Sequence, residues 1–214
     1  MKIIKKICKF KFKWIFFFLI LIVFSKKIFA QSIIVVLGDS LTEGFGVKKE
    51  EAYPYLLQNE LLKKKINVKV INGGVSGSTS ASAYSRLKWF VRLNPDIVIL
   101  ALGGNDGLRG LSLIHMKKNL SKAIELAQSE KIQILIAGMQ MPLNYGKVYT
   151  ESFRKVFFEL AKEYKIPIIP FLLKDVGGVS NFNLPDGIHP NPEGHQIIAK
   201  TVLKYIEPHL FNKK

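Results

Sequence analysis

The chain has 214 residues, of which 48% are apolar and 22% charged, and this composition excludes disordered and collagen-like proteins. Its 32 basic and 16 acidic side chains give a formal charge of +16, which would suit a nucleic-acid or anionic-membrane partner. Eight of the lysines and none of the acids lie within residues 1–30, so the other 184 residues carry 24 basic and 16 acidic side chains, a balance of +8. Half of the excess charge therefore belongs to the first 30 residues.

The first 30 residues have the layout of a secretory signal peptide. Lysines up to Lys13 precede eleven uncharged residues, Trp14–Phe24, and a small residue follows at Ala30. This run is too short for the bilayer core, which takes about 20 helical residues. We expect cleavage after Ala30 and an exported protein, periplasmic in a host with two membranes and secreted from a host with one. An uncleaved membrane anchor is the alternative, because Lys26 and Lys27 are unusual so near a cleavage site.

Cleavage would also remove Cys8, the only cysteine of the chain. The mature protein then has no thiol, which excludes disulfides, cysteine–metal sites and a cysteine nucleophile. No cluster of histidine and acidic residues has the spacing of a metal site. We therefore expect no metal and no other cofactor.

Residues 31–214 contain no fixed-period repeat, low-complexity stretch or linker, so we expect a single domain. Short apolar runs rich in β-branched residues alternate with helix-length segments whose apolar residues recur every three or four positions. Continuous apolar strands are typical of a parallel sheet covered on both faces, so the pattern predicts a three-layer α/β/α domain with about five parallel strands. In chain order we expect a strand at Ile33–Leu37, a helix at Tyr53–Lys64, a strand at Val68–Ile71, a helix at Ser82–Arg92, a strand at Ile97–Leu102, a helix at Met116–Ser129, a strand at Ile134–Ala137, a helix at Thr150–Tyr164, a strand at Ile166–Ile169 and a helix at Pro192–Tyr205.

Polar residues follow the expected strands, at the sheet edge where parallel strands end and ligands bind. They lie in the segments Gly38–Leu41, Asn72–Gly77, Gly103–Asp106 and Asp186–Pro190. A serine attacks an acyl carbon only when a base lies within hydrogen-bond reach and an acid orients that base. These segments offer such a set.

Ser40 is the candidate nucleophile, His189 the candidate base, and Asp186, three residues earlier, the candidate acid. The oxyanion of the tetrahedral intermediate also needs hydrogen-bond donors. The backbone N–H groups of Ser40 and Gly77 and the side-chain amide of Asn105 would supply three of them. This set predicts acyl transfer.

At these residues the chain resembles the SGNH (GDSL) hydrolase superfamily, whose four blocks carry Ser, Gly, Asn and His in this order. The resemblance covers almost all of the chain after residue 32. The chain is most similar to the secreted branch of arylesterases, lysophospholipase L1 and acyl-CoA thioesterase I. The segments that carry this similarity are Gly38–Leu41, Ser76-Gly77, Gly103–Gly110, Asn144–Gly146 and Asp186–Asn191. It implies a flavodoxin-like fold and a serine esterase that hydrolyses carboxylic esters and thioesters, such as aryl esters, lysophospholipids or acyl thioesters.

The same resemblance assigns further roles. It implies that Ser40 is the nucleophile, that Asp186 and His189 complete the triad, and that Gly77 and Asn105 complete the oxyanion hole.

By the same likeness Asp39 supports the serine loop, and Leu108, Met141 and Tyr145 border the acyl-chain pocket. The chain departs from the branch at Asn72-Gly73-Gly74-Val75, where small residues other than glycine are usual. We expect these glycines to loosen the loop.

Several other residues have plainer interpretations. His115, His195 and His209 lack a partner at a useful spacing, so we expect them on helix surfaces. Arg109 is expected to be a loop-surface residue or a structural hydrogen-bond donor, and Met139 to be core as readily as pocket.

Competing sites fail on spacing. The Gly-x-Ser-x-Gly elbow of α/β-hydrolases is absent, and Gly44–Lys49 lacks the third glycine of a dinucleotide loop. The lysines after residue 30 are scattered without interleaved aromatic residues, so we expect no nucleic-acid partner. The expected partners are a small acyl ester or lipid-like substrate and, transiently, an anionic membrane surface, and the protein is expected to be a monomer.

Two alternatives stay open. The same triad would serve a carbohydrate O-acetyl esterase, because catalytic residues do not encode the acyl group. A non-catalytic lipid- or glycan-binding module could use the same scaffold, although the intact set of four blocks argues against it.

Overall fold

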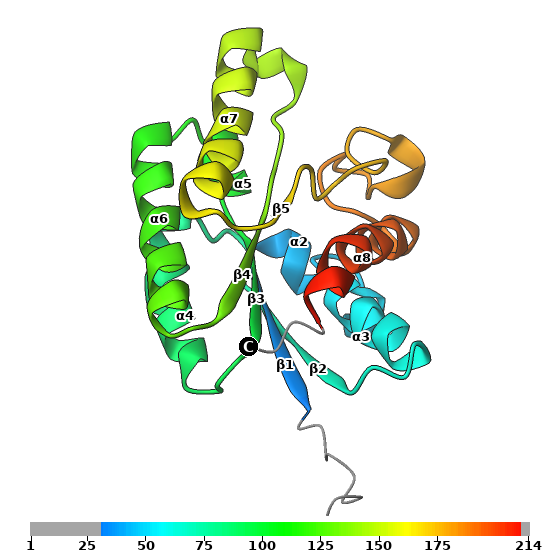
Figure 1. Ribbon diagram of the computed structural model, residues 1–214. Coiled ribbons are helices and arrows are strands. Elements are labelled where there is room, and N and C mark those ends of the chain that lie inside the picture. Colours follow the sequence, from blue (N-terminus) through cyan, green and yellow to red (C-terminus); the bar gives the residue numbers. More distant parts are fainter. Residues whose placement is uncertain (1–30, 211–214) are drawn as a thin grey trace, which may run out of the picture. The chain divides into compact units, whose positions relative to one another are not determined.

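The computed structural model describes residues 31–210 of the chain (Figure 1). The expected signal peptide, its cleavage site and Cys8 lie outside the described residues. Within residues 31–210, no helix is both long and apolar enough to cross a membrane.

Five parallel strands form one sheet in the order β2-β1-β3-β4-β5. Gly38, at the end of β1, pairs with Gly74 of β2 and Ala101 of β3, so these three strands finish at the same edge. The strands are β1 (Ser32–Gly38), β2 (Val68–Gly74), β3 (Ile97–Ala101), β4 (Gln133–Ala137) and β5 (Ile168–Ile169).

Helices cover both faces of this sheet (Figure 1). On one face α3 (Tyr53–Lys63) packs against α8 (Pro192–Ile206), and on the other α6 (Leu113–Ser129) packs between α4 (Ala83–Val91) and α7 (Lys147–Tyr164). The central strands β1 and β3 are buried almost completely, as continuous apolar runs predict. The three-layer α/β/α fold expected from the sequence is confirmed, and all ten expected elements are present with ends within three residues of those expected.

Short elements fill the loops that the pattern left unassigned. The helices α2 (Ser40–Glu43) and α5 (Gly104–Leu108) follow β1 and β3 directly. Because the described residues hold all five strands and one continuous core, they form a unit that can fold on its own. Single 3-10 turns lie at η1 (Lys49–Glu51), η2 (Ser80–Ser82), η3 (Leu143–Tyr145), η4 (Ser180–Phe182) and η5 (Glu207–His209).

The expectation of a loosened glycine loop after the second strand is wrong. β2 does not end at Ile71 but continues through Asn72, Gly73 and Gly74, which pair with β1. A Cβ on Gly74 would lie 2.1 Å from the backbone nitrogen of Glu43, so the glycine lets α2 approach the strand. Gly74 therefore tightens the contact between the serine helix and β2.

The expectation that His195 lies on a helix surface is also wrong. Its side chain is fully buried on α8, and its Nδ1 accepts a hydrogen bond from the backbone N–H of Tyr53 at 3.2 Å. Burial lowers the pKa of His195 to about 4. The position falls on the same helical face as the buried Ile198 and Val202, which is why it turns inward.

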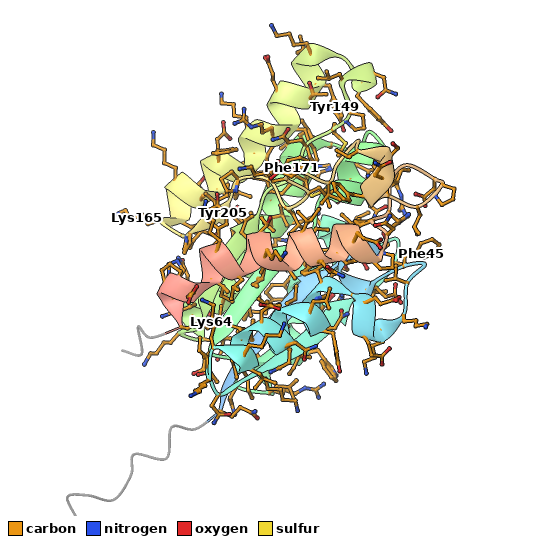
Figure 2. The ribbon with its side chains drawn as sticks, turned by 90° about the vertical axis from the view of Figure 1, so that its right-hand side faces the viewer. Phe45, Lys64, Tyr149, Lys165, Phe171 and Tyr205 are labelled. Carbon is orange, nitrogen blue, oxygen red and sulfur yellow. The ribbon has the colours of Figure 1, made fainter. Side chains whose placement is uncertain are left out.

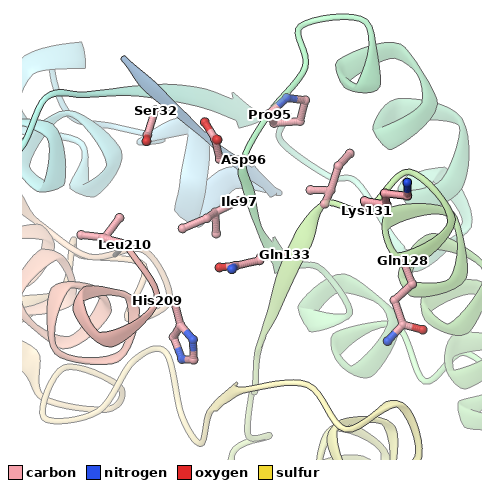
Figure 3. Close-up of a pocket in the computed structure, with 10 residues that line it drawn as sticks. Ser32, Pro95, Asp96, Ile97, Gln128, Lys131, Gln133, His209 and Leu210 are labelled. Atoms are coloured by element: carbon pink, nitrogen blue, oxygen red, sulfur yellow. The ribbon is translucent and has the colours of Figure 1, made fainter. Parts of the chain in front are cut away.

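The remaining residues with plain interpretations lie as follows. His115 is exposed on α6, His209 is half-buried in η5, and Met139 is buried in the core. His209 borders a hollow of about 750 Å³ together with Ile97 and Gln133 (Figure 3). Ile97 and Gln133 begin β3 and β4, so this hollow lies at the opposite end of the sheet from Ser40.

Candidate active site

Ser40 is presented by a tight turn from β1 into α2. Asp39 caps this helix, because its Oδ1 accepts a hydrogen bond from the backbone N–H of Leu41 at 3.1 Å. A Cβ on Gly38 would lie 1.9 Å from Thr42 Oγ1, so only glycine allows the turn to be this tight. The serine hydroxyl is thereby placed at the carboxyl edge of the sheet.

Ser40, His189 and Asp186 are hydrogen-bonded in series. His189 Nε2 lies 2.9 Å from Ser40 Oγ, and His189 Nδ1 lies 2.6 Å from Asp186 Oδ2. Asp186 Oδ1 accepts hydrogen bonds from the backbone N–H groups of Ile188 and His189 at 2.8 and 2.9 Å. Burial acts to raise the pKa of Asp186, but these hydrogen bonds and the imidazole outweigh it and lower the pKa to about 2. An ionised carboxylate holds the proton on Nδ1 and leaves Nε2 free to accept one from the serine.

The imidazole of His189 is covered by Phe45, which no motif singled out. The two ring centroids are 4.6 Å apart. The backbone N–H of Phe45 donates to the carbonyl of Ser40 at 3.1 Å, so the turn that presents the serine also places the aromatic ring. Figure 2 shows Phe45 at the edge of the molecule beside the loop that precedes α8.

The expected oxyanion donors come from the loop after β2 and from α5. Gly77 has a φ of 75°, and among the described residues the backbone N–H groups of Ser40 and Gly77 donate to no protein atom. Asn105 Nδ2 donates one hydrogen bond to the carbonyl of Ser78 at 3.0 Å. Since an amide nitrogen carries two hydrogens, the second remains for a ligand.

Residues on and next to α5 hold the Gly77 loop in place. Arg109 Nη2 donates to the carbonyl of Gly77 at 3.1 Å, which confirms the expected structural hydrogen-bond donor. The buried carboxylate of Asp106 accepts from the backbone N–H and hydroxyl of Ser80 at 2.8 and 2.6 Å. Asp106 was not singled out by sequence analysis, although it adjoins Asn105.

Two further charged residues hold the segments around Ser40 together, and sequence analysis missed both: Glu43 joins the serine helix to the Gly77 loop, and Arg86 joins the ends of β1 and β2. Glu43 Oε2 accepts hydrogen bonds from the backbone N–H of Ser76, at 2.7 Å, and from its hydroxyl. Arg86 donates to the carbonyl of Gly38, at 3.0 Å, and to that of Gly73. These contacts span segments far apart in the chain, so no local pattern signals them.

The three residues implied to border the acyl pocket meet around α5. Tyr145 Oη donates to the carbonyl of Leu108 at 3.2 Å, and Tyr149 Oη donates to that of Gly107 at 2.9 Å. Met141 is 6% exposed and packs against Gly107, whereas Tyr145 is 39% exposed. Tyr145 is therefore accessible to a ligand, Leu108 is half-buried, and Met141 belongs to the buried core.

Asp39 is an unusual carboxylate because it is buried beside the nucleophile. Burial raises its pKa from 3.8 to about 6, against the lowering effect of the Leu41 hydrogen bond and of the charges on His189 and Arg86. An acid whose pKa is raised on folding contributes stability that is fully present below its unfolded pKa of 3.8 and is lost as the pH rises through about 6.

We expect Asp39→Asn to remove this pH dependence while keeping the helix cap. A shift of about two pKa units corresponds to about 3 kcal/mol. The free energy of unfolding of the wild type, relative to the variant, should therefore rise by about 3 kcal/mol between mildly alkaline pH and pH below 4 in urea titrations. His195 is present in both proteins, so its effect cancels; a difference that does not vary with pH would contradict this prediction.

Ser40, His189 and Asp186 are hydrogen-bonded in series at the carboxyl edge of a five-stranded parallel sheet. This arrangement defines a serine hydrolase built on a three-layer α/β/α fold. The chain belongs to the GDSL-like Lipase/Acylhydrolase family, whose model matches residues 36–197. The resemblance drawn from the four sequence blocks is thereby confirmed.

Known relatives support this assignment over nearly the whole chain. Esterase TesA of Pseudomonas aeruginosa is 34% identical over 191 residues, 89% of this chain and 94% of that protein. An arylesterase of Vibrio mimicus is 36% identical over 182 residues, 85% and 91% of the two chains. The thioesterase 1/protease 1/lysophospholipase L1 of Escherichia coli is 32% identical over 198 residues, 92% and 94% of the two chains.

A solved structure of TesA, 34% identical, matches with a TM-score of 0.80 and covers 83% of this chain and 99% of that one. The fold and the sequence blocks thus point to the same family. The protein is a serine esterase.

Proposed function

We propose that this esterase cleaves carboxylic esters and thioesters with a lipid-like part through an acyl-enzyme on Ser40. The observation that carries the proposal is the hydrogen-bonded series from Ser40 Oγ through His189 to Asp186. The same series argues against a non-catalytic binding module, which has no need of a base aligned on a serine.

The reaction takes place in two displacements. His189 Nε2 takes the proton of Ser40 Oγ as that oxygen attacks the acyl carbon, and the leaving alcohol or thiol departs with the proton when its bond to the acyl carbon breaks. Water then gives a proton to Nε2 and attacks the acyl-enzyme, and the released serine oxygen recovers the proton. Asp186 stays ionised throughout and stabilises the imidazolium.

The negative oxygen of each tetrahedral intermediate is stabilised by the backbone N–H groups of Ser40 and Gly77 and by Asn105 Nδ2. One such donor is typically worth about 10²–10³ in rate. No metal or organic cofactor takes part in these steps.

The substrate class is inferred from the border of the site and from the names of the relatives. Leu108 and Tyr145 offer apolar and aromatic surface beside α5, which suits an acyl chain. The relatives are named an esterase, an arylesterase and a thioesterase 1/protease 1/lysophospholipase L1. We infer a monomer without a nucleic-acid partner, exported to the periplasm or the medium by residues 1–30.

A substrate panel tests this proposal. A chain starting at Gln31 is assayed on p-nitrophenyl esters from acetyl to palmitoyl, a lysophospholipid, an acyl thioester and an acetylated xylan oligosaccharide, with Ser40→Ala as the control. We expect hydrolysis of the longer acyl esters or thioesters and none by the folded control. Preference for the acetylated sugar would replace the lipid-like substrate by the O-acetyl alternative, and equal activity of both proteins would overturn the role of Ser40.

A further inference from the structure

The three most exposed large hydrophobic side chains of the described residues lie at the end of the molecule that carries the active site. Leu143 is 86% exposed, and Ile114 and Val148 are each 80% exposed, whereas the next, Trp89, is 54% exposed. Leu143 belongs to η3, and the other two belong to the first turns of α6 and α7, which start at the upper end in Figure 1. We call Ile114, Leu143 and Val148 the apolar tip.

A shallow hollow opens beside the apolar tip, and Val148 is one of the residues that line it. Leu111, Leu113, Tyr145 and Tyr149 also line this hollow, together with Ser112, Gly146, Lys147 and Ser152. Leu113 precedes Ile114 in the chain and Tyr145 lies in the same 3-10 turn as Leu143, so the hollow lies next to all three residues of the tip. Aliphatic side chains at such exposure bury little surface within the fold, and several of them close together are typical of a surface that another apolar phase covers.

The apolar tip is joined to the oxyanion helix. Tyr145 and Tyr149, which lie between or beside its residues, donate hydrogen bonds to the carbonyls of Leu108 and Gly107 on α5. α5 also carries Asn105. Whatever the tip contacts is therefore held next to the acyl border of the active site.

Two basic side chains adjoin the apolar tip. Lys147 lies between Leu143 and Val148 in the chain with its side chain 87% exposed, and the exposed Lys118 follows Ile114 by one helical turn. One acid, Glu151, approaches Lys147, and their charged atoms are 4.0 Å apart. Protruding aliphatic side chains with a basic rim match an anionic lipid layer in both polarity and charge.

We propose that the apolar tip inserts into the surface of an anionic lipid layer, with Lys118 and Lys147 meeting the headgroups, and so brings the active site to acyl esters held in that layer. The inference rests on the proposed hydrolysis of lipid-like esters. The hollow beside the tip is shallow, and this favours a lipid layer over a protein helix, which would need a groove to bury its apolar face.

Vesicle sedimentation tests the proposal with a chain that starts at Gln31. The vesicles are made of phosphatidylcholine alone or of phosphatidylcholine mixed with phosphatidylglycerol. The proteins are the wild type, the double variant Ile114→Ser/Val148→Ser, the variant Lys147→Glu and the control Leu62→Ser. Leu62 is a suitable control because its side chain is 52% exposed on α3, away from the tip. We expect the wild type and the control to bind the anionic vesicles, and the double variant to bind about tenfold more weakly because two aliphatic groups no longer insert. Lys147→Glu should bind the anionic vesicles several-fold more weakly than the wild type, and its binding to pure phosphatidylcholine vesicles should equal that of the wild type.

Each variant is also assayed on a soluble p-nitrophenyl ester, where we expect unchanged kcat/KM. Wild type that does not bind anionic vesicles, or a double variant that binds as well as wild type, would overturn the inference. The two proposals fail differently: a wild type that hydrolyses p-nitrophenyl esters but ignores vesicles defeats only the docking surface, whereas one that hydrolyses no ester defeats the proposed function.

Discussion

His189→Ala should lower kcat for p-nitrophenyl esters by about 10⁴-fold or more without unfolding the protein. The imidazole is the group that contacts Ser40 Oγ, at 2.9 Å, and it alone links the serine to Asp186. Without it the hydroxyl keeps its proton at neutral pH and the leaving group has no acid. Binding of the substrate depends on other residues, so we expect the loss in kcat rather than in KM.

Circular dichroism and thermal unfolding establish that the variant is folded before its kinetics are compared. His115→Ala is the matched control, because that histidine is exposed on α6 and should leave kcat unchanged. A variant that keeps more than a tenth of wild-type kcat, with the fold intact, would show that another group serves as the base.

Gly74→Ala is expected to have the second largest effect, on both stability and activity. A Cβ at this position would lie 2.1 Å from the nitrogen and 2.5 Å from the Cα of Glu43, and backbone atoms cannot move aside as a side chain does. α2 would have to shift away from β2, which separates Ser40 from the Gly77 loop. We expect the free energy of unfolding to fall by about 3 kcal/mol or more and kcat to fall by about 10²-fold.

Urea unfolding and ester kinetics measure the two effects. Gly178→Ala is the control, because its φ of 78° disfavours alanine while nothing lies within 4 Å of the added Cβ. That variant should lose only about 1–2 kcal/mol and keep its activity. A Gly74→Ala protein as stable and as active as wild type would disprove the close approach of α2 to β2.

The layered fold could be predicted because its signals are local. Apolar runs such as Ile33–Leu37 and Ile97–Leu102 are continuous, and they alternate with helical periodicity, which leaves few arrangements other than a parallel sheet covered on both faces. The extension of β2 escaped prediction because Asn72, Gly73 and Gly74 have poor strand propensity. Pairing with β1 and the approach of α2 outweigh that propensity.

The site divides in the same way. Ser40, Asp186 and His189 were predictable because acyl transfer requires these groups and parallel strands bring the loops to one edge. Phe45 and Glu43 were not, because their contacts with His189 and Ser76 join segments far apart in the chain. The burial of His195 did have a local signal, which is its three- and four-residue spacing to buried neighbours on α8. A histidine without a partner is nevertheless usually expected on a helix surface.

The central claim, that acyl transfer passes through Ser40, is tested most directly by covalent trapping. The chain starting at Gln31 is treated with a phosphonate that carries a p-nitrophenyl leaving group, and the adduct is located by intact-mass and peptide mass spectrometry. We predict one phosphonyl group per chain, attached to Ser40, with activity lost in proportion to labelling, and no adduct on folded Ser40→Ala. Inactivation with the label on another residue, or an active Ser40→Ala protein, would contradict the account.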